Sequence, residues 1–384
     1  LSLCAMRDQI VPPTTTVEQG ECEFGNLNLT IEVSRQVEID RSMNMSMGFG
    51  GANACVVLKR HKSVDLGRQA LRRSSKSACD VLITGVGVLL PGAVGNDAFV
   101  RSLTSGARPD LKAALDESEY THLFNARRAR RMSDYVKYTL AATSLALRDA
   151  GIDDEAAFGQ QCGAIIGSTD GAGGYSETYY RQVVNEGIAS ANPLLFAEGV
   201  PNVGSAQLSL MLGLKGGAQA IIGSRTAGLE ALHLATRRIA TGEAHRLIVT
   251  AAEERTDLLE TAYQRCEKPD LTLGMGAVTL VLEGAESAGQ RSAAPRGTVV
   301  ATGCCRTNGS DPSELRGAIE NLDVVHGKGC TMSMRLNGMM AETFSVNALA
   351  ELAAGLLTDT SDFSVLASDP LGLAAIACVR PHLR

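Results

Sequence analysis

The sequence predicts an α/β fold in which buried strands alternate with amphipathic helices. The clearest unit lies between Ile221 and Thr250, where a short apolar run leads into a Gly-rich turn, a helix with apolar residues at helical spacing, and a second apolar run at Leu247–Thr250. The order strand–helix–strand–helix–strand occurs twice in residues 81–384, first over 81–290 and again over 291–384. This repeat predicts two similar halves, which by itself carries no function.

The composition indicates a globular protein and excludes several classes of function. The chain has 384 residues, of which 45% are hydrophobic and 20% are charged. Its net charge of −6 argues against nucleic acid as the main partner. No apolar run approaches the ~20 residues of a membrane span, and no stretch resembles a signal peptide. We therefore expect a cytoplasmic protein that does not bind membranes.

The cysteines predict neither disulfides nor a metal site. Ten cysteines are scattered among apolar neighbours, with Cys304 and Cys305 adjacent and no Cys-x-x-Cys in the chain. Such spacing is typical of free, mostly buried thiols. We therefore expect no metal ion and no bound cofactor.

The turn before the long helix carries the most specific signal. Residues 223–228 read Gly-Ser-Arg-Thr-Ala-Gly and resemble the nucleophile elbow of β-ketoacyl synthases, Thr-Ala-Cys-x-x-Gly. The spacing alone would also fit an ordinary buried βαβ unit. On the resemblance, Arg225 takes the place of the catalytic cysteine. A guanidinium stays protonated and is no nucleophile, so the resemblance implies that this chain cannot form the acyl thioester on which condensation depends.

Three further stretches strengthen this resemblance. The strand that begins at Val81, VLITGVGVLLPGAVG, is similar to the first ketosynthase strand, and its glycines do not form the G-x-G-x-x-G of a dinucleotide site. Residues 192–217 resemble the segment that precedes the nucleophile strand and packs along the dimer axis of the family. Residues 273–283, LGMGAVTLVLE, resemble the strand that closes the first half. The resemblance implies a thiolase-like αβαβα layered fold.

The other catalytic positions of the family are altered as well. Active ketosynthases use two histidines, which activate the malonyl thioester and hold the developing oxyanion. His326 lies where the first would be, although an ordinary loop histidine is the simpler interpretation. Asn337 takes the place of the second, Met332 replaces the lysine before it, and residues 368–373 lack the Gly-Phe-Gly-Gly loop. These concordant losses resemble the chain length factor, the silent β subunit of type II polyketide ketosynthases.

Residues 1–60 resemble a different part of the same family. The stretches AMRDQIVPPTTT and MSMGFGGANACVVLKR are similar to the C-terminal tail of a catalytic ketosynthase α subunit, where a Gly-rich loop lies over the active-site cysteine. Phe49 matches the gating phenylalanine of that loop, and the flanking glycines match Gly48, Gly50 and Gly51. We hypothesise that residues 1–60 complete the partner subunit, either as a fusion joint or after cleavage of a precursor.

The strand Ala54–Leu58 is the reason for this hypothesis. The strand Leu373–Val379 already supplies a final strand for the chain's own sheet, so the earlier strand would be surplus there. A strand has no stability alone, and we expect it to pair within the partner's sheet. Residues 61–80 are basic and polar and predict a linker, with a short surface helix at 66–73 as the alternative.

Two sets of side chains are candidates for binding. A basic cluster contains four arginines: Arg127, Arg128, Arg130 and Arg131. This cluster is either a solvated surface or a docking patch for the acidic acyl carrier protein. Large side chains at a dimer interface can block chain growth, and Tyr180 and Phe196 are the candidates for such a tunnel wall.

The residues together predict a non-catalytic subunit. We expect residues 81–384 to form a heterodimer with a catalytic ketosynthase α subunit and to shape the polyketide tunnel. The partner would perform the decarboxylative Claisen condensation on phosphopantetheine thioesters of the acyl carrier protein. Two alternatives remain open. One is a divergent β-ketoacyl synthase or acyltransferase that uses His326 and a cysteine, and the other is a stand-alone module that binds acyl chains.

Overall fold

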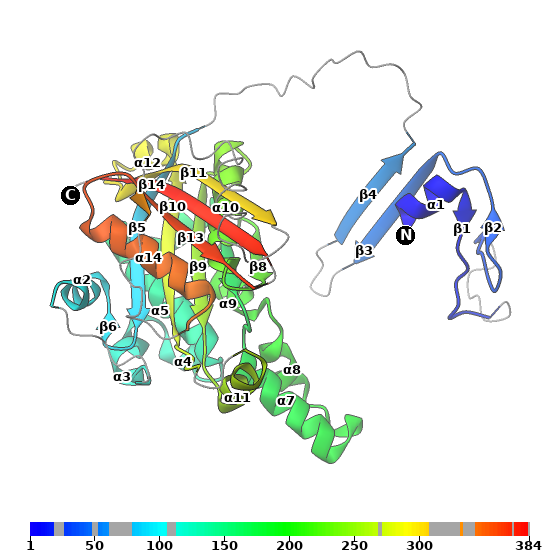
Figure 1. Ribbon diagram of the computed structural model, residues 1–384, viewed down its shortest axis with the longest axis horizontal. Helices are drawn as coiled ribbons and strands as arrows, with labels where there is room; N and C mark the ends of the chain where they lie inside the picture. Colours follow the sequence, from blue (N-terminus) through cyan, green and yellow to red (C-terminus); the bar gives the residue numbers. More distant parts are fainter. Residues whose placement is uncertain are drawn as a thin grey trace, which may run out of the picture. The chain divides into compact units, whose positions relative to one another are not determined.

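The computed structural model of the chain describes residues 1–18, 27–47, 53–60, 79–105, 113–267, 271–306, 331–332, 342–370 and 372–382. These residues separate into two units, Leu1–Ser75 and Lys76–Arg384 (Figure 1). None of the helices in these ranges combines the length and the hydropathy that a bilayer crossing requires.

The smaller unit contains a β-hairpin with a short helix beside it. Strand β3 (Arg41–Met47) pairs antiparallel with β4 (Asn53–Lys59). Helix α1 (Ser2–Asp8) contacts β3, and the hydroxyl of Ser2 donates a hydrogen bond to Asn44. Strands β1 (Ile10–Val11) and β2 (Arg35–Gln36) form a second small ladder. The predicted strand Ala54–Leu58 therefore forms, and among the described residues one of its edges is free to pair further.

The larger unit is built on one mixed sheet with the order β12-β13-β14-β11-β5-β10-β9-β7-β8, and the short β6 pairs with β5. Its strands are β5 (Val81–Leu90), β6 (Ala93–Val94), β7 (Cys162–Ser168), β8 (Ala218–Ile222), β9 (Arg246–Glu253), β10 (Gly276–Gly284), β11 (Gly297–Arg306), β12 (Thr331–Met332), β13 (Phe363–Ser368) and β14 (Leu373–Pro381). The predicted α/β class is confirmed.

The two halves of this sheet share one strand order. The first half runs β8-β7-β9-β10-β5 and the second runs β12-β13-β14-β11. In the first half, β10 is antiparallel to its neighbours β9 and β5. In the second half, β14 is likewise antiparallel to β13 and β11. The halves join where β5 pairs with the start of β11.

Helices lie on both faces of the sheet (Figure 1). They are α2 (Asn96–Thr104), α3 (Glu117–Tyr120), α4 (Ala126–Ala129), α5 (Asp134–Asp149), α6 (Glu155–Gly159), α7 (Gly173–Glu186), α8 (Pro193–Gly199), α9 (Val203–Leu212), α10 (Ala227–Ala240), α11 (Asp257–Cys266), α12 (Ala285–Gln290) and α14 (Ser345–Thr358), with 3-10 turns at Thr121–Leu123 and Ile188–Ser190. Helices α10 and α14 contact each other and strands of both halves, whereas α5 covers the other face of β5, β9 and β10.

The glycines of β5 have a packing role. A Cβ on Gly85 would lie 2.2 Å from the carbonyl oxygen of Ala146, and one on Gly87 would lie 2.1 Å from that of Ala142. Helix α5 can therefore approach the strand only because these two residues lack side chains. Val86, which lies between them, faces the core that contains α10 and α14. The Gly-x-Gly pattern is thus explained by helix packing.

Candidate functional site

The predicted elbow forms between β8 and α10. Strand β8 ends at Ile222, residues 223–226 turn, and α10 begins at Ala227 before the chain returns in β9. A Cβ on Gly228 would lie 2.3 Å from the carbonyl oxygen of Ser345, so the start of α10 touches the start of α14. The elbow therefore lies where the two central helices begin.

Arg225 lies at this elbow between two carboxylates and an aromatic ring. Its Nε donates to Glu342 Oε2 at 3.0 Å, and its Nη2 donates to Glu267 Oε2 at 2.7 Å. The guanidinium carbon lies 5.0 Å from the ring centre of Phe344. Burial opposes the charge, but the bonds to Glu267 and Glu342 outweigh burial and raise the pKa of Arg225. The elbow therefore holds a permanent cation.

Glu342 is held in place by more than Arg225. Its Oε1 accepts from the backbone N–H of Phe344 at 2.9 Å and from Nδ2 of Asn347 at 3.1 Å. Phe344 has φ 40°, a conformation that a bulky residue adopts only where its surroundings enforce it. The Phe344 ring is buried and stacks against Tyr263 with 4.6 Å between centres. The ion pairs of Arg225 thus belong to a packed network.

A fully buried carboxylate, Glu253, lies at the end of β9. It accepts hydrogen bonds from Oγ of Ser345 at 2.5 Å, from the N–H of Thr169 at 2.7 Å and from Oγ of Ser168 at 3.0 Å. Burial raises the pKa of Glu253 to about 7 despite these donors. Sequence reasoning missed this residue, although an acidic pair at the end of the apolar run LIVTAA was a visible signal.

A cavity of about 440 Å³ opens between α7 and α11. Its lining includes the aliphatic Val184, Leu258 and Leu259, together with Tyr180 and Asp170. Tyr180, one of the predicted tunnel-wall residues, therefore faces a cavity. The other predicted wall residue, Phe196, does not line it.

Two aromatic contacts lie near the cavity and the elbow. Phe196 packs on Tyr179, with 5.6 Å between ring centres. Tyr263 stacks on Phe344 beside Arg225, and its hydroxyl donates to Asp170 at 3.2 Å. Burial raises the pKa of that Asp170 carboxyl. Tyr263 thus connects the floor of the cavity to the network around Arg225.

Several predicted site residues lie outside the described residues: His326, Asn337, Gly48, Phe49, Gly50 and Gly51. The side chain of Met332 is likewise not described. The four arginines of the basic cluster, Arg127, Arg128, Arg130 and Arg131, are exposed at and after α4. None of the four forms an ion pair with a residue that the structure describes. The cluster therefore presents uncompensated positive charge.

The expectation of mostly buried thiols is wrong, because only Cys162 and Cys378 are buried among the eight cysteines that the structure describes. The buried and half-buried thiols are poor nucleophiles. Burial raises the pKa of Cys162 and that of Cys304 to about 12, and it also raises the pKa of Cys305. These thiols stay protonated near neutral pH, and the thiolate is the reactive form. In the part of the chain that the structure describes, no three His, Cys, Asp or Glu side chains gather as a metal site would require.

Comparison with known families shows which proteins the chain is similar to. Residues 110–265, which include the elbow, match the β-ketoacyl synthase N-terminal domain. The chain is therefore similar to β-ketoacyl synthases over this segment. It is 27% identical over 260 residues to the 3-oxoacyl-[acyl-carrier-protein] synthase 2 of Vibrio cholerae, covering 58% of this chain and 62% of that protein. It is 26% identical over 254 residues to a putative polyketide β-ketoacyl synthase 1 of Streptomyces halstedii, with coverages of 56% and 60%.

The chain thus spans about three fifths of the length of the curated relatives that it matches. Two solved structures share its fold. A type II PKS acyl carrier protein in complex with its ketosynthase matches with a TM-score of 0.66 at 18% identity, covering 79% of this chain and 100% of that one. The ishigamide ketosynthase/chain length factor matches with a TM-score of 0.66 at 20% identity, with coverages of 79% and 99%. The fold of the large mixed sheet is therefore similar to that of ketosynthase structures.

Proposed function

We propose that this chain is a non-catalytic subunit of a type II polyketide β-ketoacyl synthase, similar to a chain length factor. The observation that supports the proposal is Arg225, which we align with the nucleophile position and which is paired with Glu267 and Glu342. Condensation begins by acyl transfer to a thiolate, and a guanidinium cannot accept the acyl group. In this proposal a partner subunit supplies the cysteine and the two histidines.

An exposed apolar surface supports a partner subunit. Large apolar side chains stand in solvent along α7, α8, α9 and the turn between α7 and α8: Tyr180, Val184, Ile188, Leu194, Phe196 and Leu210. Next to them in the sequence, β8 is an edge strand with Ile222 exposed. Apolar patches and open sheet edges are typical of interfaces. We assign this surface to the contact with a cysteine-bearing ketosynthase, in line with the ketosynthase/chain length factor pairing named for a structural neighbour.

The cavity between α7 and α11 is the proposed share of the polyketide tunnel. It adjoins the exposed surface through Tyr180, which is 65% exposed and also lines the cavity. Val184, Leu258 and Leu259 give it an apolar side that suits a growing acyl chain, although polar side chains such as Glu177 and Arg181 also line it. In this proposal Tyr180 limits the length of that chain. The basic cluster around Arg128 is the proposed docking patch for the acyl carrier protein, which would bring the phosphopantetheine thioesters.

The smaller unit is proposed to complete the partner. Met43, Met45 and Met47 of β3 share one face of the hairpin with Cys55 and Val57 of β4, and all five side chains are exposed. A two-stranded hairpin is marginal alone and gains stability by packing such a face against another element. We assign that packing to the partner subunit, where Phe49 and its neighbouring glycines would reach the partner's cysteine.

The rival enzyme hypothesis is not favoured. It needs a reactive cysteine, and the raised pKa values of Cys162 and Cys304 exclude those two thiols, so that the exposed Cys4, Cys55 and Cys266 would have to serve. A stand-alone acyl-binding module would account for the cavity, but it would leave the exposed surface on α7, α8 and α9 without a role. The heterodimer accounts for both features.

Co-purification with a cysteine-bearing ketosynthase tests the proposal. The complex is treated with a cysteine-directed ketosynthase inhibitor, and both chains are analysed by mass spectrometry. We expect the label on the partner alone, condensation by the complex, and no turnover by this chain in isolation. Specific labelling of a cysteine in this chain with loss of activity, or turnover by the isolated chain, would refute a silent subunit.

A further inference from the structure

A second pocket lies at the end of the sheet opposite the elbow. The elbow follows the carboxyl end of β8, whereas this pocket of about 220 Å³ surrounds the amino ends of β7, β8 and β9. At ~3.3 Å per residue, the eight residues of β9 separate the two ends by roughly 25 Å. The pocket is therefore remote from the proposed tunnel and needs its own explanation.

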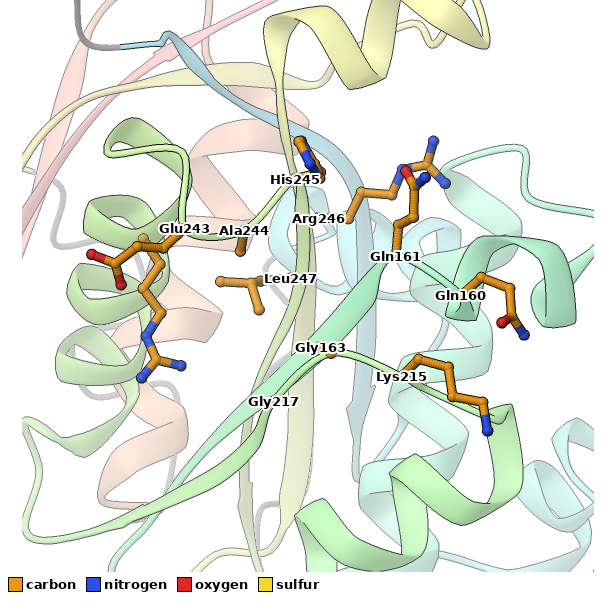
Figure 2. A pocket seen from close by; sticks show the side chains of 12 residues that line it. Gln160, Gln161, Gly163, Lys215, Gly217, Glu243, Ala244, His245, Arg246 and Leu247 are labelled. Atoms are coloured by element: carbon orange, nitrogen blue, oxygen red, sulfur yellow. The ribbon is translucent and has the colours of Figure 1, made fainter. Parts of the chain in front are cut away.

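Glycines and polar side chains line this pocket. Gly163 and Gly217 lie in its middle, with Gln160 and Lys215 on one side and Glu243 on the other (Figure 2). The space beside Gly217 is open. A Cβ added to this glycine would have one neighbour, Nη1 of Arg238, at 3.9 Å. The pocket thus has open space beside its glycines and a positively charged side chain next to that space.

Two of the cations that line the pocket are uncompensated. Arg246 is already matched, because its Nε donates to Ser287 at 2.7 Å and lies 3.4 Å from the Glu283 carboxylate. By contrast, neither Lys215 nor Arg238 forms an ion pair within the described ranges. Their charges remain available to a ligand.

Further lining groups modify this charge. Gln160, Gln161 and the His245 imidazole add potential hydrogen-bond donors. Glu243, which accepts a hydrogen bond from the Thr241 hydroxyl at 3.2 Å, is the one carboxylate of the lining. Two free cations against one carboxylate leave the pocket positive overall.

We propose that this pocket binds a phosphate group, either as inorganic phosphate or as a phosphate monoester. Lysine and arginine are the side chains that bind phosphate oxygens, and arginine offers paired donors. At about 30 Å³ per water the volume holds roughly seven waters, which leaves room for a phosphate and a small organic group. This site is independent of the proposed tunnel and would be a regulatory or accessory site of the subunit.

Calorimetric titration of the full chain with inorganic phosphate, in a phosphate-free buffer of low ionic strength, tests the site. Arg238→Ala and Lys215→Ala should each weaken binding at least about tenfold, the effect of losing one charge-assisted hydrogen bond. Arg237→Ala is the matched control. Arg237 directly precedes Arg238 in α10, and its exposed side chain does not line the pocket. Glu243→Gln should tighten binding, because it removes the one opposing charge.

Gly217→Glu keeps the site testable if Arg238→Ala fails to fold. The new carboxylate would lie close to Arg238 and should abolish phosphate binding while the unfolding temperature is retained. A parallel titration with glycerol 3-phosphate identifies the source: tighter binding than inorganic phosphate indicates a monoester, and weaker binding indicates the free ion. The proposal is overturned if neither probe binds in the millimolar range, if Arg237→Ala weakens binding as much as Arg238→Ala, or if Glu243→Gln does not tighten it.

Discussion

Arg225 and Glu342 are 117 residues apart in the sequence, and the Nε of the arginine donates to the glutamate Oε2 at 3.0 Å. Glu342 also accepts from the N–H of Phe344, immediately before α14, so this bond ties the elbow to the start of the second central helix. At the position that we align with the family's nucleophile, this chain carries a structural cross-link. Arg225 therefore has a stability role, whatever part it has in catalysis.

Removal of Arg225 should destabilise the fold without stopping condensation by the complex. In Arg225→Ala, Glu267 and Glu342 lose a partner in a site where the arginine side chain is only 21% exposed. We expect a loss of about 1–3 kcal/mol in the free energy of unfolding, measured by urea denaturation. Arg181→Ala, which removes an arginine that is 63% exposed from its pair with Glu177, should cost less than about 1 kcal/mol. Loss of condensation with unchanged stability would contradict this role for Arg225.

Stability should fall as the pH rises from about 4.5 to about 7, because of Glu253. Its pKa is about 7 in the folded state and near 4.5 in the unfolded state, so the unfolded chain binds fewer protons throughout this window. The contribution amounts to about 3 kcal/mol at most, at ~1.4 kcal/mol per pKa unit. Glu253→Gln should flatten the dependence of unfolding free energy on pH relative to the wild type. Glu286→Gln, at an exposed position of α12, is the control, and equal slopes in all three proteins would refute the assignment.

Tyr180 and Phe196 should differ as determinants of product length. Tyr180 lines the cavity between α7 and α11, whereas Phe196 packs on Tyr179 beside it. We expect Tyr180→Ala to lengthen or scatter the products of the complex by enlarging the cavity, and Phe196→Ala to do so more weakly. Product analysis by mass spectrometry, with the partner's acylation rate as control, separates the two. Unchanged products for Tyr180→Ala would remove this cavity from the tunnel.

The apolar face of the hairpin should be needed for the complex. Met45→Asp places a charge among Met43, Met47 and Val57 and should weaken co-purification with the partner, whereas Asn44→Asp on the opposite face should not. Deletion of residues 1–60 should abolish activity. Phe49→Ala should keep the complex but slow acyl loading or chain extension. Full activity after the deletion would show that this unit has no part in catalysis.

The sequence predicted the elements of the site better than its contacts. Strand β8, the turn, α10 and β9 follow from apolar runs and from the Gly-Ser-Arg-Thr-Ala-Gly letters, which are local signals. The partners of Arg225 could not be predicted, because Glu267 and Glu342 lie 42 and 117 residues away and meet it only when the sheet closes.

Burial was the other property that local patterns did not reveal. The acidic pair after LIVTAA was visible in the sequence, but the burial of Glu253 depends on Ser345 and Thr169, which lie 92 and 84 residues away. The Gly-x-Gly of β5 was visible in the sequence, but its packing role depends on Ala142 and Ala146 of α5. The N–H of Val86 also donates to Asp149 of that helix, 63 residues away.

The pairing of β5 with β10 has a consequence for biogenesis. The hydroxyl of Thr84 reaches the Glu283 carboxylate 199 residues later, at 2.7 Å, and β5 lies between β10 and β11 in the sheet. During synthesis the strand VLITGVGVLL therefore leaves the ribosome long before either long neighbour exists. Loop closure over such separations is slow, and an unpaired apolar strand is prone to aggregate in the interval. Production of this chain should therefore depend on slow translation or on chaperones that shield β5 until Gly276–Gly284 has emerged.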